Sequence, residues 1–174
     1  MKIGICPGSF DPVTLGHMDI ITRACKIFDK VIVAVPVNPD KRASFTVEER
    51  MEMLRMATAG MNVEVDGVSG LLADYAREKN ATAIVKGLRA LTDFEYEYQM
   101  ALTNKKLNPE VETMFLPTSM ENMFLSSSMV KQIAGFGGDI SHFVPECLLD
   151  RINERLCRTV TEGAAAEIRK EWNP

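Results

Sequence analysis

The sequence predicts an α/β protein: a Rossmann-like, five-stranded parallel sheet with helices on both faces, in a single domain. Two observations favour this class. Five short apolar segments alternate with segments of helical periodicity along the chain. The first of these segments, residues 3–6, is apolar throughout and is followed by a helical segment, which is typical of parallel strands buried on both faces. We expect the domain to span residues 1–157, followed by a helical or partly ordered tail over residues 158–174.

The predicted strands are the most apolar and β-branched segments. They comprise residues 3–6, 30–35, 63–65, 83–85 and 112–116. The predicted helices cover residues 18–28, 46–59, 70–79 and 92–107, and two more begin at the serines 126–128 and at Pro145. Thr46 with Glu49, and Thr92 with Glu95, have the spacing of capping boxes, which indicates two helix starts.

Composition limits the function classes. Of 174 residues, 46% are hydrophobic and 25% charged, as in ordinary soluble domains. The 20 Lys and Arg against 24 Asp and Glu give a net charge of −4, which argues against non-specific nucleic-acid binding. We find neither a signal peptide nor a transmembrane segment, so we expect a cytoplasmic protein without membrane or nucleic-acid partners. The four cysteines have no zinc or disulfide spacing.

The first turn is the strongest candidate for a functional site. Residues 8–17 read GSFDPVTLGH and lie between an apolar strand and a helix. A helix N-terminus offers unpaired N–H groups and a partial positive charge, and glycine allows a ligand to approach the backbone. His17 would lie at that end and donate to a phosphate oxygen. The alternative is a structural histidine that caps the turn.

Three further turns carry cations or hydroxyls at or near the carboxyl ends of strands. They contain Lys41 with Arg42, Lys86 with Arg89, and Ser126, Ser127 and Ser128 with Lys131. In a doubly wound sheet such turns meet at one edge, so they predict a cationic cleft suited to a polyphosphate. Taken alone, Lys41 with Arg42 is also consistent with a solvated basic loop, and the three serines are also consistent with an ordinary helix cap.

The sequence lacks several common catalytic signatures. It has no G-x-G-x-x-G, no Walker lysine motif, no Ser/His/Asp order and no metal-ligand cluster. A site without its own nucleophile acts by positioning two bound substrates and stabilising charge. This combination indicates direct phosphoryl or nucleotidyl transfer.

These motifs resemble those of a known family. The tetrapeptide from Thr14 to His17 is similar to the T-x-G-H signature of Rossmann-like nucleotidyltransferases. The KGLR turn from Lys86, the DFEYE segment after it, and the SSSMVK segment from Ser126 resemble the later motifs of one branch, the phosphopantetheine adenylyltransferases of bacterial coenzyme A synthesis. The resemblance covers about residues 2–157, with all motifs in order.

The resemblance implies that the adenylyl group of ATP passes to 4′-phosphopantetheine by in-line attack without a covalent intermediate, giving dephospho-coenzyme A and pyrophosphate. It also implies Mg²⁺ as cofactor, feedback binding of coenzyme A and a homohexamer. The implied catalytic residues are His17, Lys41 and Arg89. The implied ATP-binding residues are Ser9, Phe10, His17, Gly87, Leu88, Arg89, Glu97, Asn122, Met123, Phe124, Leu125, Ser126, Ser127 and Ser128. Those for the second substrate are Ser9, Lys41, Leu72 and Lys86; no residue is assigned to the metal.

Two site positions depart from the family pattern. Lys86 stands where the family usually has Arg, so the charge is kept but the bidentate fork is lost. Asn122 stands where an aromatic residue is often found. The alternatives are another adenylyl- or cytidylyltransferase, such as one acting on nicotinate mononucleotide, and a nucleotide-binding module without catalysis. Thr14, where an H-x-G-H member has His, argues against the first; His17, Lys41 and Arg89 together argue against the second.

Overall fold

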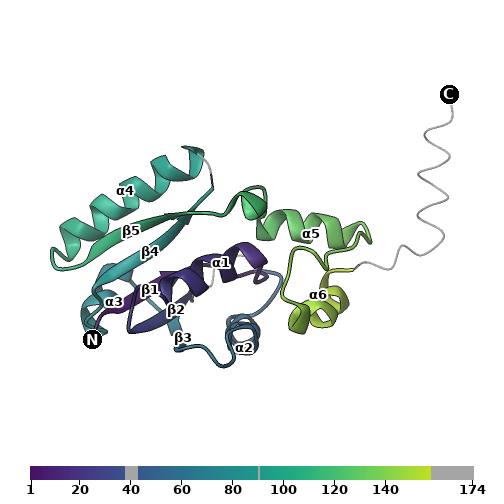
Figure 1. The fold of residues 1–174 in the computed structure, drawn as a ribbon, viewed down its shortest axis with the longest axis horizontal. Helices are drawn as coiled ribbons and strands as arrows, with labels where there is room; N and C mark the ends of the chain where they lie inside the picture. Colours follow the sequence, from purple (N-terminus) through teal and green to yellow (C-terminus); the bar gives the residue numbers. More distant parts are fainter. Residues whose placement is uncertain (38–42, 90, 158–174) are drawn as a thin grey trace.

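A computed structural model of the protein describes residues 1–37, 43–89 and 91–157, with backbone alone for residues 91–93. Its five strands form one parallel sheet in the order β3-β2-β1-β4-β5 (Figure 1). The strands are β1 Ile3–Pro7, β2 Lys30–Pro36, β3 Val63–Val68, β4 Ala83–Leu88 and β5 Glu112–Pro117. The predicted five-stranded parallel sheet is confirmed.

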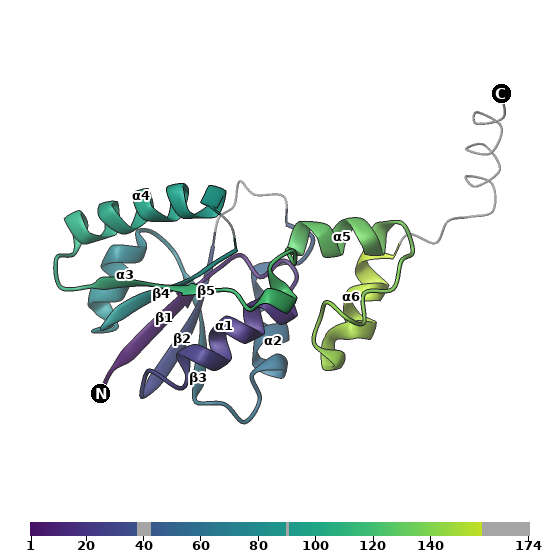
Figure 2. The same ribbon diagram turned by 45° about the horizontal axis from the view of Figure 1, so that its top comes forward.

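Helices cover both faces of the sheet, as predicted. The α-helices are α1 Leu15–Ala24, α2 Val47–Ala57, α3 Leu72–Glu78, α4 Leu91–Leu107, α5 Ser127–Gly135 and α6 Leu149–Leu156, with 3₁₀ turns η1 Met120–Asn122 and η2 Glu146–Leu148. Helices α1 and α2 lie on one face, α3 and α4 on the other, and α5 and α6 beyond one end of the sheet (Figure 2). In the part of the chain described, no helix is long and apolar enough to cross a membrane.

Strand β2 shows why a strand near the middle of the sheet has an unbroken run of apolar residues. Its Val31, Val33 and Val35 belong to the core under α1 and α2, whereas Ile32 and Ala34 belong to the core under α3. All five side chains are buried. Alternate side chains of a strand point to opposite faces, so a strand covered on both sides needs apolar residues at every position.

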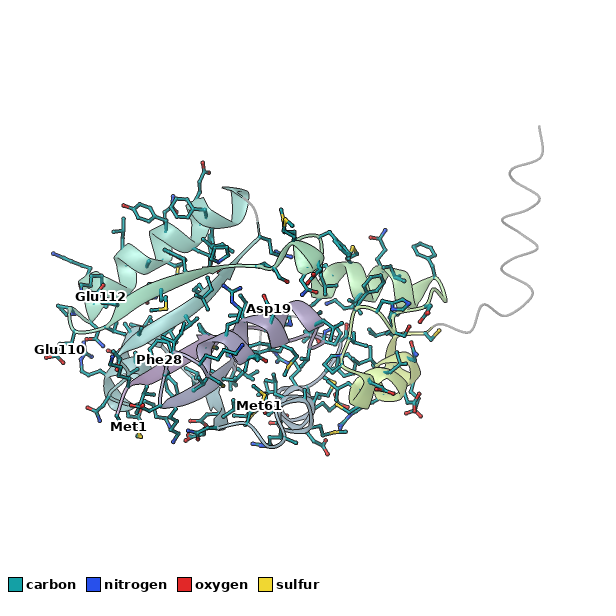
Figure 3. The ribbon with its side chains drawn as sticks, in the orientation of Figure 1. Met1, Asp19, Phe28, Met61, Glu110 and Glu112 are labelled. Atoms are coloured by element: carbon teal, nitrogen blue, oxygen red, sulfur yellow. The ribbon has the colours of Figure 1, made fainter. Side chains whose placement is uncertain are left out.

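The order of the strands reverses at β1. Strands β2 and β3 follow on one side of it, and β4 and β5 on the other. All pairs are parallel, so the carboxyl ends of β1 and β4 lie at the same edge of the sheet. The chain leaves these two strands in opposite directions, which opens a crevice between them. Ligands of open α/β sheets usually bind in such a crevice. Figure 3 shows Met1, Glu110 and Glu112 at the opposite end of the sheet from α5.

Two helix starts differ from the sequence prediction. Helix α1 begins at Leu15 rather than near Met18, because the Thr14 hydroxyl accepts the His17 N–H (3.3 Å) and caps the helix earlier. Helix α4 begins at Leu91 and includes Thr92, so the prediction of Thr92 as its N-cap is wrong. The other predicted capping box, at Thr46 and Glu49, is confirmed by hydrogen bonds of 2.8 and 3.2 Å.

We predict that Gly4→Ala destabilises the protein by about 1–3 kcal/mol, since a methyl group there would lie 2.7 Å from the Phe28 ring. Gly135→Ala is the control, because nothing lies within 4 Å of the added carbon and alanine favours a helix. Thermal and urea unfolding would measure both. Phe28→Leu should recover part of the loss in the Gly4→Ala protein. Equal stability of the Gly4→Ala and wild-type proteins would contradict this packing.

Candidate active site

A cleft of about 850 Å³ opens at the carboxyl ends of β1 and β4. It brings together most of the predicted site residues. Those that line it are Ser9, Phe10, His17, Leu72, Lys86, Gly87, Arg89, Glu97, Leu125, Ser126, Ser127 and Ser128. The predicted residues that do not line it are Leu88, Asn122, Met123 and Phe124. The predicted Lys41 lies outside the described residues.

The turn after β1 is folded tightly back on itself. Phe10 adopts φ 50°, in the left-handed region that non-glycine residues rarely occupy, and its ring is buried. A Cβ on Gly8 would lie 2.9 Å from this ring, so only glycine allows the ring to cover the turn. The Phe10 ring meets the His17 ring edge to face, with centroids 4.9 Å apart. The turn therefore supports the histidine directly.

The capping box at the start of α1 fixes the tautomer of His17. The Thr14 N–H donates to His17 Nδ1 over 3.0 Å. A ring nitrogen that accepts an N–H carries no proton, so the proton of the neutral ring is on Nε2. The ring lines the cleft, and its enclosure, followed by the charge of Arg89, lowers its pKa to about 4. His17 is thus a neutral N–H donor near pH 7.

This protonation state limits what His17 can do. A neutral imidazole with its proton on Nε2 can donate a hydrogen bond to an oxygen that gains negative charge. Its Nδ1 is occupied by the backbone and is unavailable as a base. The geometry therefore suits stabilisation of a phosphate oxygen rather than proton transfer.

The first turn of α5 forms another wall of the cleft. Ser126 caps the helix by accepting the Met129 N–H (3.1 Å), and Ser127 Oγ donates to the Pro12 carbonyl (2.7 Å). Two of the three serine hydroxyls therefore hold the fold together. Among the described residues, the backbone N–H groups of Ser127 and Ser128 at the start of this turn have no hydrogen-bond acceptor and remain suited to an anion. Arg89 Nη1 donates to the Leu125 carbonyl (3.2 Å), which places its guanidinium beside this turn.

Lys86 and Glu97, both predicted to bind substrates, bind each other. Lys86 Nζ lies 3.0 Å from Glu97 Oε2, and about a fifth of each side chain is exposed. The Lys86 ammonium is therefore partly neutralised by Glu97. A phosphate at Lys86 would share or displace this carboxylate.

Asp11 is a buried residue that we did not predict. Its carboxylate accepts the N–H groups of Ser44 (3.1 Å) and Phe45 (2.9 Å) and pairs with Lys131 Nζ (2.9 Å). Burial alone would raise the pKa of Asp11, but Lys131 and the two N–H groups hold it below its usual range. Lys131, predicted in an anion cradle, is thus neutralised by Asp11. The sequence shows Asp11 only as a turn residue before a proline.

Asn122 is held beside the cleft without lining it. Its Nδ2 donates to Ser119 Oγ (2.9 Å). The Ser119 N–H in turn donates to Asp19 on α1 (3.2 Å), which Figure 3 labels between α1 and the chain after β5. Arg23 donates to the Pro117 carbonyl (2.6 Å) from the same helix. These bonds fix the path from β5 to α5.

Neither a metal centre nor a reactive thiol stands out in the described part of the chain. It contains no group of three or more His, Cys, Asp or Glu side chains that could hold a metal ion. Cys6 lines the cleft, but burial, followed by the proximity of Cys25, raises the pKa of its thiol to about 12. All four cysteines are free, and Cys6 is buried.

The chain matches the family model described as cytidylyltransferase-like over residues 5–133. Among similar curated proteins, the phosphopantetheine adenylyltransferase of Caldanaerobacter subterraneus subsp. tengcongensis is 58% identical over 156 residues, which are 89% of this chain and 98% of that protein. The phosphopantetheine adenylyltransferase of Heliobacterium modesticaldum is 55% identical over 161 residues, which are 92% of this chain and 96% of that protein.

Solved structures share the fold. The nicotinic acid mononucleotide adenylyltransferase of Plasmodium falciparum, complexed with NaAD, has a TM-score of 0.65 at 16% identity, covering 88% of this chain and 95% of its own. A putative nicotinate-nucleotide adenylyltransferase from Vibrio parahaemolyticus has a TM-score of 0.64 at 21% identity, covering 90% of this chain and 98% of its own. At these identities the similarity concerns the fold alone.

We predict that His17 stays neutral with its proton on Nε2 from pH 8 to about pH 5. Nitrogen-15 NMR of the imidazole would show the tautomer and a midpoint near 4. The unfolded chain takes up this proton near 6.5, so the ring lowers the stability of the fold as the pH falls from 6.5 towards 4. A midpoint near 6.5, or a proton on Nδ1, would refute the assignment.

Proposed function

Because the chain belongs to the phosphopantetheine adenylyltransferase family of the cytidylyltransferase-like proteins, we propose that its cleft transfers the adenylyl group of ATP to 4′-phosphopantetheine. The products are dephospho-coenzyme A and pyrophosphate. The observation that carries the proposal for this site is the neutral Nε2–H of His17, held by Thr14 in the same cleft as Arg89 and the first turn of α5.

The proposed reaction needs no protein nucleophile. An oxygen of the 4′-phosphate attacks the α-phosphorus of ATP, and the bond to the bridging oxygen of pyrophosphate breaks. Negative charge grows on the equatorial oxygens of the α-phosphate, and the Nε2–H of His17 donates to one of them. Arg89 and the N–H groups of the first turn of α5 bind the triphosphate and hold it in line.

The second substrate binds on the other side of His17 in this proposal. Ser9 and Lys86 contact its phosphate, and Leu72 borders its pantetheine arm; all three line the cleft. Lys41, which is outside the described residues, completes the phosphate contacts. Because Lys86 pairs with Glu97, phosphate binding exchanges one anionic partner of the ammonium for another or shares it between them. The ATP contacts proposed for Leu88, Asn122, Met123 and Phe124 rest on the family resemblance alone.

Mg²⁺ is the proposed cofactor and would enter with ATP. Glu97 is the one carboxylate among the described residues that line the cleft, and it already pairs with Lys86. This donor set fits a magnesium ion held mainly by phosphate oxygens and water, which is its usual coordination in nucleotide sites. The ion neutralises charge on the phosphates when bound.

Four further points belong to the same proposal. The division into a domain over residues 1–157 and a tail over residues 158–174 stays a prediction from the sequence, because residues 158–174 lie outside the described residues. The homohexamer, feedback binding of coenzyme A and a cytoplasmic location rest on the family resemblance and on the sequence features described above.

An acceptor assay tests the proposed function. With ATP and Mg²⁺, we expect pyrophosphate release with 4′-phosphopantetheine and a rate at least about 10³-fold lower with nicotinate mononucleotide, whose recognition needs different buried polar partners. Coupled detection of pyrophosphate, with mass spectrometry of the nucleotide product, measures both. Pyrophosphate release with the mononucleotide alone would overturn the substrate, and release with neither acceptor would overturn the activity.

We also predict that His17→Ala lowers kcat by about 10²–10³-fold while the Kd for ATP changes less than about 3-fold, because the contact strengthens only as charge develops. His17→Gln retains an N–H donor and should lose less. His142→Ala is the matched control, because His142 is the other histidine and is exposed. Wild-type kcat in His17→Ala would exclude the proposed role.

A further inference from the structure

Arg50 is a buried arginine next to the cleft. It lies on α2 with 6% of its surface exposed. Its Nη1 donates to the Ser9 carbonyl (2.8 Å), and its Nε donates to the Thr46 carbonyl (3.2 Å). No carboxylate of the described residues forms a salt bridge with it. Arg50 does not itself line the cleft.

A buried charge that pairs with none of the described carboxylates needs a reason. Removing a guanidinium from water costs several kcal/mol unless hydrogen bonds and an opposite charge offset it, and buried arginines are usually paired. Here the guanidinium bonds to two backbone carbonyls, and one of these belongs to the turn that supports His17. Arg50 lies on the same face of α2 as Met53, Leu54 and Ala57, which pack against the core. An apolar residue at position 50 would serve the same packing. Stability alone does not account for the choice of residue.

The bond to Ser9 determines where the next N–H points. The carbonyl and the N–H of a trans peptide point in opposite directions, so a Ser9 carbonyl directed at Arg50 turns the Phe10 N–H away from Arg50. Within the described residues, the Phe10 N–H has no hydrogen-bond acceptor, and both Ser9 and Phe10 line the cleft. Phe10 is also at φ 50°, a conformation that persists only when its surroundings hold it.

We propose that Arg50 is a positioning residue that holds the Ser9–Phe10 peptide with its N–H directed at the phosphates of ATP. Its positive charge, one peptide group behind the turn, adds to the attraction for the same anion. The inference rests on the proposed function for the identity of the ligand. The geometric argument for Arg50 requires only that a polyphosphate binds in the cleft.

Three variants test the role of Arg50. Arg50→Met removes the charge and both hydrogen bonds while keeping an apolar stem. Arg50→Lys keeps the charge but can reach one carbonyl at a time. Arg55→Met, on the exposed side of the same helix, is the control for loss of a positive charge. Circular dichroism and thermal melting establish that each variant is folded before kinetics are measured.

We expect Arg50→Met to lower kcat/KM for ATP by about 10–100-fold, mainly through kcat, and Arg50→Lys to lower it by about 3–10-fold. Arg50→Met should melt within a few degrees of the wild type, because replacing a buried charge by an apolar group is often neutral for stability. Arg55→Met should match the wild type. Kinetics in Arg50→Met equal to those of Arg55→Met would overturn the proposal. If Arg50→Met does not fold, wild-type kinetics in Arg50→Lys would overturn it instead.

Calorimetry with ATP and Mg²⁺ separates this inference from the proposed function. The affinity of Arg50→Met for ATP should be at least about 3-fold weaker than that of the wild type. If the wild type binds ATP but releases no pyrophosphate with 4′-phosphopantetheine, the proposed function fails, and the calorimetric difference still decides the role of Arg50. Equal ATP affinity in wild type and Arg50→Met, with equal kinetics, leaves no positioning role.

Discussion

The buried carboxylate of Asp11 is the interaction on which the arrangement of the site depends. It joins the turn after β1 to the segment at Ser44 that precedes α2, and to Lys131 on α5. The bond from Ser127 to the Pro12 carbonyl strengthens the same junction. Three parts of the chain are therefore fixed to one point, and two of them, the turn after β1 and the start of α5, carry proposed phosphate ligands. Removing any one partner would leave a buried charge or N–H group unsatisfied, which is costly in an apolar interior.

Around this junction the described residues provide a set of hydrogen-bond donors. The capping interaction of Thr14 makes His17 a donor, because it occupies Nδ1 and leaves the proton on Nε2. Backbone N–H groups at the start of α5 and the guanidinium of Arg89 supply further donors. Such a set stabilises a developing charge without reorganising, and this is what direct transfer between two bound phosphates requires. The proposed chemistry therefore depends on the capping of α1 and α5 as much as on the side chains in the cleft.

The sequence was sufficient for the fold and for most of the cleft lining. Apolar strands alternating with helices predicted the parallel sheet, and the rule that such strands end at one edge brought His17, Lys86 and Arg89 together. It was insufficient where a contact depends on a distant partner. Asp11 meets Lys131 120 residues away, and Arg50 meets Ser9 41 residues away; no local pattern encodes either pair. For the same reason two serine hydroxyls that resembled ligands proved to bond within the protein.

The central position of β1 has a consequence for synthesis of the chain. Strand β1 pairs with β2 early, but its other neighbour, β4, begins at Ala83, so one edge of β1 stays open until half of the chain has been made. Lys131, the partner that completes the Asp11 junction, follows later still. Long-range pairing of this kind makes folding slow and leaves an unpaired strand exposed in partly made chains. The junction that joins the walls of the cleft can therefore close only after residue 131 has been made.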